Sequence, residues 1–156
     1  MIQVDIPGKE CLKIRHVIFD YNGTIGKDGK LIQGVKQGIR QFSDRLTFHV
    51  LTADTFGSAK KQLQGVNALL TVISKDNQHQ KKLDYLDALG AEQTLCAGNG
   101  RNDVLMLKKA CIGIAVLGDE GVSSACLSAS DIVVKDILDV FGLLKTPERI
   151  IATLRL

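Results

Sequence analysis

The sequence is poor in aromatic residues, and this scarcity narrows the kinds of protein that it can form. It contains no Trp, and aromatic residues make up only 4% of its 156 residues. A core without large aromatic side chains has to be built from aliphatic residues, and long aliphatic runs are typical of buried parallel strands flanked by helices. The scarcity also removes the stacking surfaces that bind nucleic-acid bases, so we expect no nucleic-acid partner.

The sequence also lacks the residue spacings of common metal sites, secretion signals and membrane spans. Its four cysteines form no C-x-x-C pair, its three histidines have no metal-ligand spacing, and its charges begin at Asp5, before any long apolar run. We therefore expect a reduced, cytoplasmic protein with no membrane association. The residues concerned are Cys11, Cys96, Cys111, Cys126, His16, His49 and His79.

Charge of one sign is scarce as well. The 20 basic and 17 acidic residues are interleaved along the chain and leave a formal net charge of +3. Mixed charges of this kind are typical of a solvated surface and not of a basic stripe for nucleic acid. The length is that of a single domain covering residues 1–156, long enough to bury one core.

Aliphatic runs alternate with amphipathic stretches along most of the sequence. This alternation predicts an α/β fold, a three-layer Rossmann-like sandwich with a mostly parallel central sheet. Glycines at 23, 26 and 29 predict a small flap around 27–29, directly after the first core strand. The expected strands are 2–6, 12–19, 46–51, 68–73 (a buried strand), 94–97, 111–116 and 131–134, and the expected helices are 34–45, 58–64, 78–89, 122–127, 137–144 and 147–154.

Polar residues gather directly after several of the predicted strands. Three of the groups are Asp20-Tyr-Asn-Gly-Thr24, Thr52-Ala-Asp54 and Gly98-Asn-Gly-Arg-Asn-Asp103, and Lys82 stands on a predicted helix between the last two. Taken singly, each has an ordinary structural explanation as a turn, a cap or a solvated side chain. In a parallel sheet the carboxyl ends of the strands share one edge, where ligands bind. Their joint order therefore predicts a site at that edge.

The order of these groups resembles the signature of the haloacid dehalogenase superfamily, which is D-x-x-G-T, then Thr or Ser, then Lys, then G-D-x-x-x-D. Within it, Asp20-Tyr-Asn-Gly-Thr24-Ile is similar to the phosphorylation motif of P-type ATPases, whose membrane helices and other domains have no counterpart in this sequence. The finer likeness is to soluble P-type-ATPase-like phosphatases. The resemblance covers about residues 14–134 and implies a Mg²⁺-dependent phosphatase of the hydrolase class that works through an aspartyl phosphate.

The resemblance also implies roles for single residues in binding and transferring a phosphoryl group. Asp20 would be the nucleophile, and Thr52 would donate a hydrogen bond to a phosphoryl oxygen, helped by backbone amides near Tyr21 and Ala53. Lys82 would neutralise the nucleophile and the phosphate. Two neighbouring lysines stay open as alternatives for this role, Lys75 and Lys81.

The same resemblance implies a Mg²⁺ site made of oxygen ligands. The carboxylates of Asp20 and Asp103, the backbone carbonyl of Asn22 and the side chain of Asn99 would hold the ion. Asn99 stands where the family pattern has Asp, so one negative charge is missing and we expect weaker Mg²⁺ binding.

Asn22 is a second departure, because phosphatases of this superfamily carry an acid two residues after the nucleophile. An amide cannot act as the general acid and base, whose contribution is typically about 10²–10⁴-fold, so we expect slow turnover. Asp54 is a candidate substitute base. The alternative is a catalytically degenerate module that binds phosphate, nucleotide or a protein partner.

A cap domain has no room in this sequence. About ten residues separate Thr24 from the first predicted helix, and about thirty separate Thr52 from Lys82. These gaps accommodate only the flap and one helix with one strand. We therefore expect an open site that takes a phosphorylated small molecule or macromolecule, or that a second copy covers in a homo-oligomer.

Overall fold

A parallel β-sheet forms the centre of the protein, for which the computed structural model describes residues 1–8, 10–54 and 57–155. The strand order is β10-β9-β8-β3-β6-β7, and neighbouring strands are parallel throughout. The predicted parallel sheet is therefore confirmed. Its strands are β3 (His16–Asp20), β6 (Thr47–Thr52), β7 (Leu69–Val72), β8 (Thr94–Gly98), β9 (Ile112–Val116) and β10 (Ile132–Val134).

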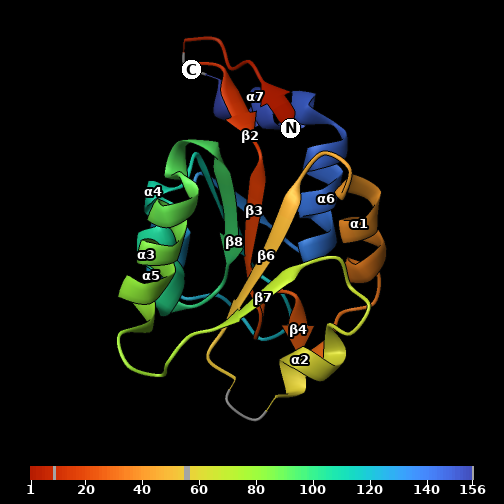
Figure 1. Ribbon diagram of the computed structural model, residues 1–156. Helices are drawn as coiled ribbons and strands as arrows, with labels where there is room; N and C mark the ends of the chain where they lie inside the picture. Colours follow the sequence, from red (N-terminus) through yellow and green to blue (C-terminus); the bar gives the residue numbers. More distant parts are fainter. Residues whose placement is uncertain (9, 55–56, 156) are drawn as a thin grey trace.

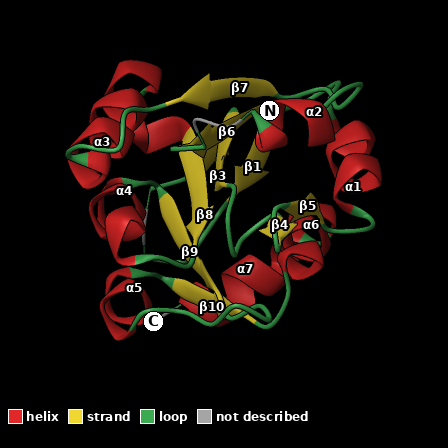
Figure 2. Ribbon diagram, turned by 90° about the horizontal axis from the view of Figure 1, so that it is seen from below, coloured by secondary structure: helices red, strands yellow, loops and turns green. Residues whose placement is uncertain are grey.

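Helices cover both faces of this sheet, which confirms the predicted three-layer sandwich. Figure 2 shows α3, α4 and α5 on one face and α1, α6 and α7 on the other. In the described ranges, no helix combines the length and the apolar character needed to cross a bilayer. The helices are α1 (Val35–Phe42), α2 (Ser58–Gln62), α3 (Gln78–Leu89), α4 (Val104–Lys109), α5 (Ser124–Ala129), α6 (Ile137–Lys145) and α7 (Pro147–Leu154), with short 3₁₀ turns η1 (Ala91–Gln93) and η2 (Arg101–Asp103).

The alternation of side chains along each strand builds two cores, one on either face of the sheet. In β3, Val17 and Phe19 pack into the core under α1 and α6, whereas Ile18 packs into the core under α3, α4 and α5. All three side chains are fully buried. Burial of one such side chain stabilises the fold by about 1.5–3 kcal/mol, which fixes the register of β3 and thus the position of its last residue.

Two small antiparallel hairpins lie at opposite ends of the molecule. The first, β1 (Ile2–Val4) and β2 (Leu12–Ile14), packs beside α7 near both termini. The second, β4 (Gly26–Lys27) and β5 (Lys30–Leu31), lies at the carboxyl end of β3 and is the predicted flap (Figure 1). Within the described residues no cap domain covers this end of the sheet.

The strand predicted at 68–73 is present, but the expectation that it is buried was wrong. β7 is the last strand of the sheet, and its Leu69 and Val72 side chains are 56% and 54% exposed. An aliphatic run predicts a strand equally well at the edge and in the centre of a sheet, because both positions favour the same residue types.

Candidate active site

The candidate site begins at Asp20, the last residue of the central strand β3. β3 lies between β8 and β6, so Asp20 sits where three carboxyl ends meet (Figure 1). The chain then turns tightly, with the amides of Ile25 and Gly26 donating to the carbonyl of Tyr21 at 3.1 and 2.8 Å. Gly23 has a φ of 79°, a backbone conformation that favours glycine. The G-T part of the motif therefore serves the geometry of this turn.

Lys82 reaches Asp20 from α3. It lies one helical turn before Leu86 on the buried face of that helix, so its side chain points toward the sheet. Its ammonium lies 2.5 Å from Oδ1 of Asp20 and 2.6 Å from Oδ1 of Asp103, and its side chain is 1% exposed. By contrast, Lys81 donates to Ser74 at the surface, and the side chain of Lys75 is exposed. The structure thus brings Lys82 to the nucleophile position.

Asp103 is held from both sides by protein donors. Its Oδ1 accepts from Lys82, and its Oδ2 accepts from the backbone N–H groups of Asn99 and Gly100 at 3.1 and 2.9 Å. A Cβ atom on Gly98 would lie 2.5 Å from the Asp103 carboxyl carbon, so the close approach requires glycine. Asp103 therefore positions Lys82 and the 98–103 loop, and its role as a Mg²⁺ ligand stays a prediction.

Burial and charge act in opposite directions on this cluster. Burial raises the pKa of Asp20 to about 7, and the charge of Asp103 adds to the rise, although Lys82 partly opposes it. Burial alone would lower the pKa of Lys82, but the carboxylates of Asp20 and Asp103 outweigh it and raise that pKa above its ordinary value. Lys82 therefore stays protonated, whereas burial opposes the ionisation of Asp20.

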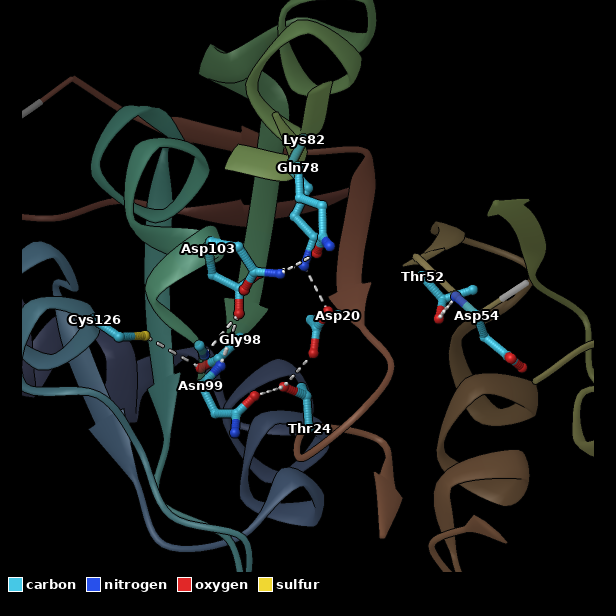
Figure 3. Close-up of polar contacts among 12 residues, drawn as sticks. Asp20, Thr24, Thr52, Asp54, Gln78, Lys82, Gly98, Asn99, Asp103 and Cys126 are labelled. Carbon is cyan, nitrogen blue, oxygen red and sulfur yellow. Dashed lines mark hydrogen bonds and ion pairs between the residues drawn. The ribbon is translucent and has the colours of Figure 1, made fainter. Parts of the chain in front are cut away.

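Thr24 and Asn99 extend the site on the other side of Asp20. The Thr24 hydroxyl lies 3.4 Å from Oδ2 of Asp20 and 3.2 Å from Oδ1 of Asn99 (Figure 3). The Asn99 side chain donates its Nδ2 to the carbonyl of Gly121 at 2.9 Å, which fixes the orientation of the amide with its oxygen toward Thr24. The sequence motif contained Thr24, but the resemblance assigned it no role.

The oxygen atoms around Asp20 fit a hard cation. Two buried carboxylates share a single ammonium, so the cluster carries an excess negative charge once Asp20 is ionised. Asp20 and Asn99 present oxygen atoms near each other, which suits Mg²⁺. Among the residues that the structure describes, no group of three or more His, Cys, Asp or Glu side chains converges, so the ion would depend on amide and carbonyl oxygens, including that of Asn22.

Thr52 lies on the opposite side of Asp20 from Lys82 and Asp103 (Figure 3). It is the last residue of β6 and is 1% exposed, and its hydroxyl accepts from the N–H of Asp54 at 3.1 Å. Thr52 and Ala53 border the site at this strand end, and their phosphate-binding roles stay predictions.

Asp54 has a structural task in α2. Its Oδ2 accepts from the Ser58 hydroxyl at 2.6 Å and from the N–H of Ala59 at 2.7 Å, so the carboxylate caps the first turn of the helix. In Figure 3 the Asp54 side chain points away from Asp20, and its role as a substitute for the missing general base stays a prediction.

Tyr21 and Asn22 face in different directions from the turn. Tyr21 is fully buried, and its hydroxyl donates to the carbonyl of Gly29 at 3.2 Å, which ties the flap to the turn. The Asn22 side chain is exposed, as expected for a residue at the entrance of an open site. The phosphate-binding role of the Tyr21 amide stays a prediction.

Solved structures with a similar fold include phosphatases. The 3-deoxy-D-manno-octulosonate 8-phosphate phosphatase of Moraxella catarrhalis, solved with magnesium, phosphate and KDO, aligns with a TM-score of 0.70 at 12% identity, over 91% of this chain and 94% of that one. The cobalt-bound deoxy-D-mannose-octulosonate 8-phosphate phosphatase of Haemophilus influenzae gives 0.65 at 18%, over 87% and 95%. A phosphoserine phosphatase gives 0.69 at 14%, over 86% and 99%. The chain therefore has the same fold as these three phosphatases.

Sequence relatives are found in Methanocaldococcus jannaschii. No protein-family model matches the sequence. The uncharacterized protein MJ0072 is 41% identical over 39 residues, which are 25% of this chain and 89% of that protein. The uncharacterized protein MJ0073 is 47% identical over 78 residues, which are 47% of this chain and 84% of that protein. The chain therefore belongs to the same family as MJ0073.

Proposed function

We propose that this protein is a Mg²⁺-dependent phosphohydrolase that works through an aspartyl phosphate at Asp20. The observation that carries the proposal is the buried cluster of Asp20, Lys82 and Asp103 at the carboxyl edge of the sheet. A buried lysine that is fixed by a second carboxylate offers a permanent positive charge beside the nucleophile. The phosphatases that share the fold support the same reaction class.

The residues of the chain account for both halves of the reaction. The carboxylate of Asp20 attacks phosphorus, the bond from phosphorus to the leaving-group oxygen breaks, and that oxygen keeps the electron pair and takes a proton from solvent. Water then attacks phosphorus and gives up a proton to solvent, the bond to Asp20 breaks, and phosphate leaves with the carboxylate restored. Lys82 and the Thr52 hydroxyl offset charge on the phosphoryl oxygens. Asp20, Asn22, Asn99 and Asp103 would hold Mg²⁺, which would supply further charge neutralisation.

Asn22 sets the expected rate and the preferred substrates. Without an acid at this position the leaving group has to depart as a stable anion, so we expect slow turnover that favours acyl and aryl phosphates. The uncapped site suits a phosphorylated small molecule or macromolecule. The Asn22 and Asn99 variants of the motifs also support a place in the soluble P-type-ATPase-like subgroup.

A second function has one observation in its favour. Both departures from the family pattern, Asn22 and Asn99, replace an acid by an amide. A module that only binds phosphate or a nucleotide would tolerate both changes, because binding needs no proton transfer. This module would keep the cation Lys82 but would release no product.

Phosphate release from p-nitrophenyl phosphate and from acetyl phosphate, with and without Mg²⁺, separates the two functions. We expect Mg²⁺-dependent release from the wild-type protein and none from the Asp20→Asn variant. Equal rates in both proteins would leave only the binding module.

A further inference from the structure

The flap forms polar contacts with a loop that follows another strand of the central sheet. This loop, the β9–α5 loop, covers residues 117–123 and joins β9 to α5. Lys27 of the flap forms an ion pair with Asp119, and the N–H of Asp28 donates to Glu120 Oε1 at 2.8 Å. These partners are 92 residues apart in the sequence. The contacts therefore tie together two segments that the chain itself does not connect.

The same loop forms two hydrogen bonds with Asn99. The Gly121 carbonyl accepts from Nδ2 of Asn99 at 2.9 Å, and the N–H of Ser123 donates to the backbone carbonyl of Asn99 at 2.9 Å. A Cβ atom on Gly23 would overlap the Asn99 amide, so the amide lies directly against the glycine backbone. A small cavity of about 90 Å³ next to Thr24 is lined by residues of both the flap and the loop.

The orientation of the Asn99 amide decides what it can offer to the site. A carbonyl only accepts, so the Gly121 contact requires the NH₂ group and directs the amide oxygen toward Thr24 and Asp20. If the Gly121 carbonyl moved away, the amide would be free to rotate and present NH₂ toward the site. An NH₂ group repels a cation, whereas an amide oxygen binds it.

We propose that Lys27, Asp119 and Glu120 are positioning residues that hold the Asn99 amide, through the β9–α5 loop, with its oxygen toward Asp20. The inference rests on the proposed function in one respect, since that oxygen is taken as a Mg²⁺ ligand. The position of the flap and the orientation of the Asn99 oxygen toward the Mg²⁺ site are then coupled. A flap that detaches, for example to admit substrate, would weaken Mg²⁺ binding at the same time.

A charge reversal in the flap tests the coupling. In Lys27→Glu the new carboxylate faces Asp119, with Asp28 and Glu120 nearby, so the flap should detach. We expect the Mg²⁺ dissociation constant, measured by calorimetry, to rise by roughly two- to fivefold, the range that follows from exposed ion pairs. If charge acted only through space, Lys27→Glu would lower the Mg²⁺ dissociation constant, because the variant adds negative charge near the site.

Two further variants make the result specific. Lys30→Glu changes the same charge on the other strand of the flap and should not weaken Mg²⁺ binding. The charge swap Lys27→Glu with Asp119→Lys should restore wild-type affinity. Unchanged or tighter Mg²⁺ binding in Lys27→Glu, or failure of the swap to restore it, overturns the proposal.

A second readout does not depend on the metal. In metal-free protein, hydrogen exchange of the Asn99 side-chain NH₂, followed by NMR, should accelerate in Lys27→Glu and return to the wild-type rate in the swap. If the wild-type protein bound no Mg²⁺, the metal part of the proposed function would fail, and this exchange rate would still decide the coupling. An exchange rate equal to that of the wild type would overturn it.

Discussion

At the scale of single residues, we expect Asn22 to limit the chemistry proposed for Asp20. Its side chain is exposed at the turn after β3, so a carboxylate would fit there without burial. We predict that Asn22→Asp raises the turnover of p-nitrophenyl phosphate, by up to about 10²-fold, because it supplies an acid and base next to the leaving group. Steady-state phosphate release measures the change.

The prediction for Asn22 has a matched comparison. Asn102→Asp makes the same substitution on a side chain whose amide donates to Gln78 and not to Asp20, and it should give no such increase. An unchanged or lower turnover in Asn22→Asp would count against the missing acid as the cause of slow catalysis.

Asp20 itself should destabilise the metal-free fold at neutral and alkaline pH. Its pKa is raised from 3.8 to about 7, so its contribution to stability is complete below 3.8 and is lost as the pH rises through 7. We predict that Asp20→Asn, in EDTA, melts higher than the wild type at pH 8, on the order of 2–4 °C, and much closer to it at pH 4. Thermal melts at the two pH values measure this, and a variant that is less stable at pH 8 would contradict the electrostatic account of the cluster.

At the scale of elements, the helix at Gln78–Leu89 shows what the sequence predicts well. Apolar residues at helical spacing and Gly90 after the last turn mark both ends, and α3 has the predicted bounds. The edge position of β7 was not predictable, because an aliphatic run does not record how many neighbours its strand has. The same limit applies to every strand whose neighbours are distant in sequence.

A hydrogen-bonded chain of side chains links three elements on the α3 face of the sheet. His16 Nδ1 lies 3.2 Å from His49 Nε2, and His49 Nδ1 lies 3.0 Å from the Tyr85 hydroxyl. Burial, followed by the charge of His16, lowers the pKa of His49 from 6.5 to about 4. The stability that neutral His49 contributes is therefore complete above pH 6.5 and is lost as the pH falls toward 4.

A comparison of variants tests this pH dependence. Between pH 7 and pH 4, we predict that His49→Gln loses less of its melting temperature than the wild type does, by on the order of 2–4 °C. His79→Gln, on an exposed side chain, should follow the wild type. Equal losses of melting temperature in His49→Gln and the wild type would show that His49 does not cause the destabilisation at acid pH.

The cap of α2 leads to a prediction about Asp54. Asp54→Ala removes the acceptor for Ser58 and for the N–H of Ala59, and should lower the free energy of unfolding by about 1 kcal/mol. Asp54→Asn keeps an acceptor oxygen, so its phosphate release should match that of the wild type. Denaturant unfolding and the phosphatase assay measure the two effects. A large loss of turnover in the stable Asp54→Asn variant would support Asp54 as a candidate base.

At the scale of the whole molecule, the sequence predicted which residues gather but not how they are held. The order of the strand ends was enough to bring Asp20, Lys82 and the 98–103 loop to one edge, because parallel strands share that edge. It was not enough to show that both oxygens of Asp103 are held by protein donors. Nor did it reveal that Gly121 orients Asn99, because a backbone carbonyl leaves no trace in the residue types.

Asp20 is the proposed acceptor of the phosphoryl group, and a structure determined with Mg²⁺ and beryllium fluoride would identify the acceptor. Beryllium fluoride bonds to a carboxylate as an analogue of the phosphoryl group. We predict beryllium bound to a carboxylate oxygen of Asp20, with the Lys82 ammonium beside a fluorine atom and Asp103 still holding Lys82. Beryllium bound to another residue of the Mg²⁺-loaded protein would contradict the assignment of Asp20.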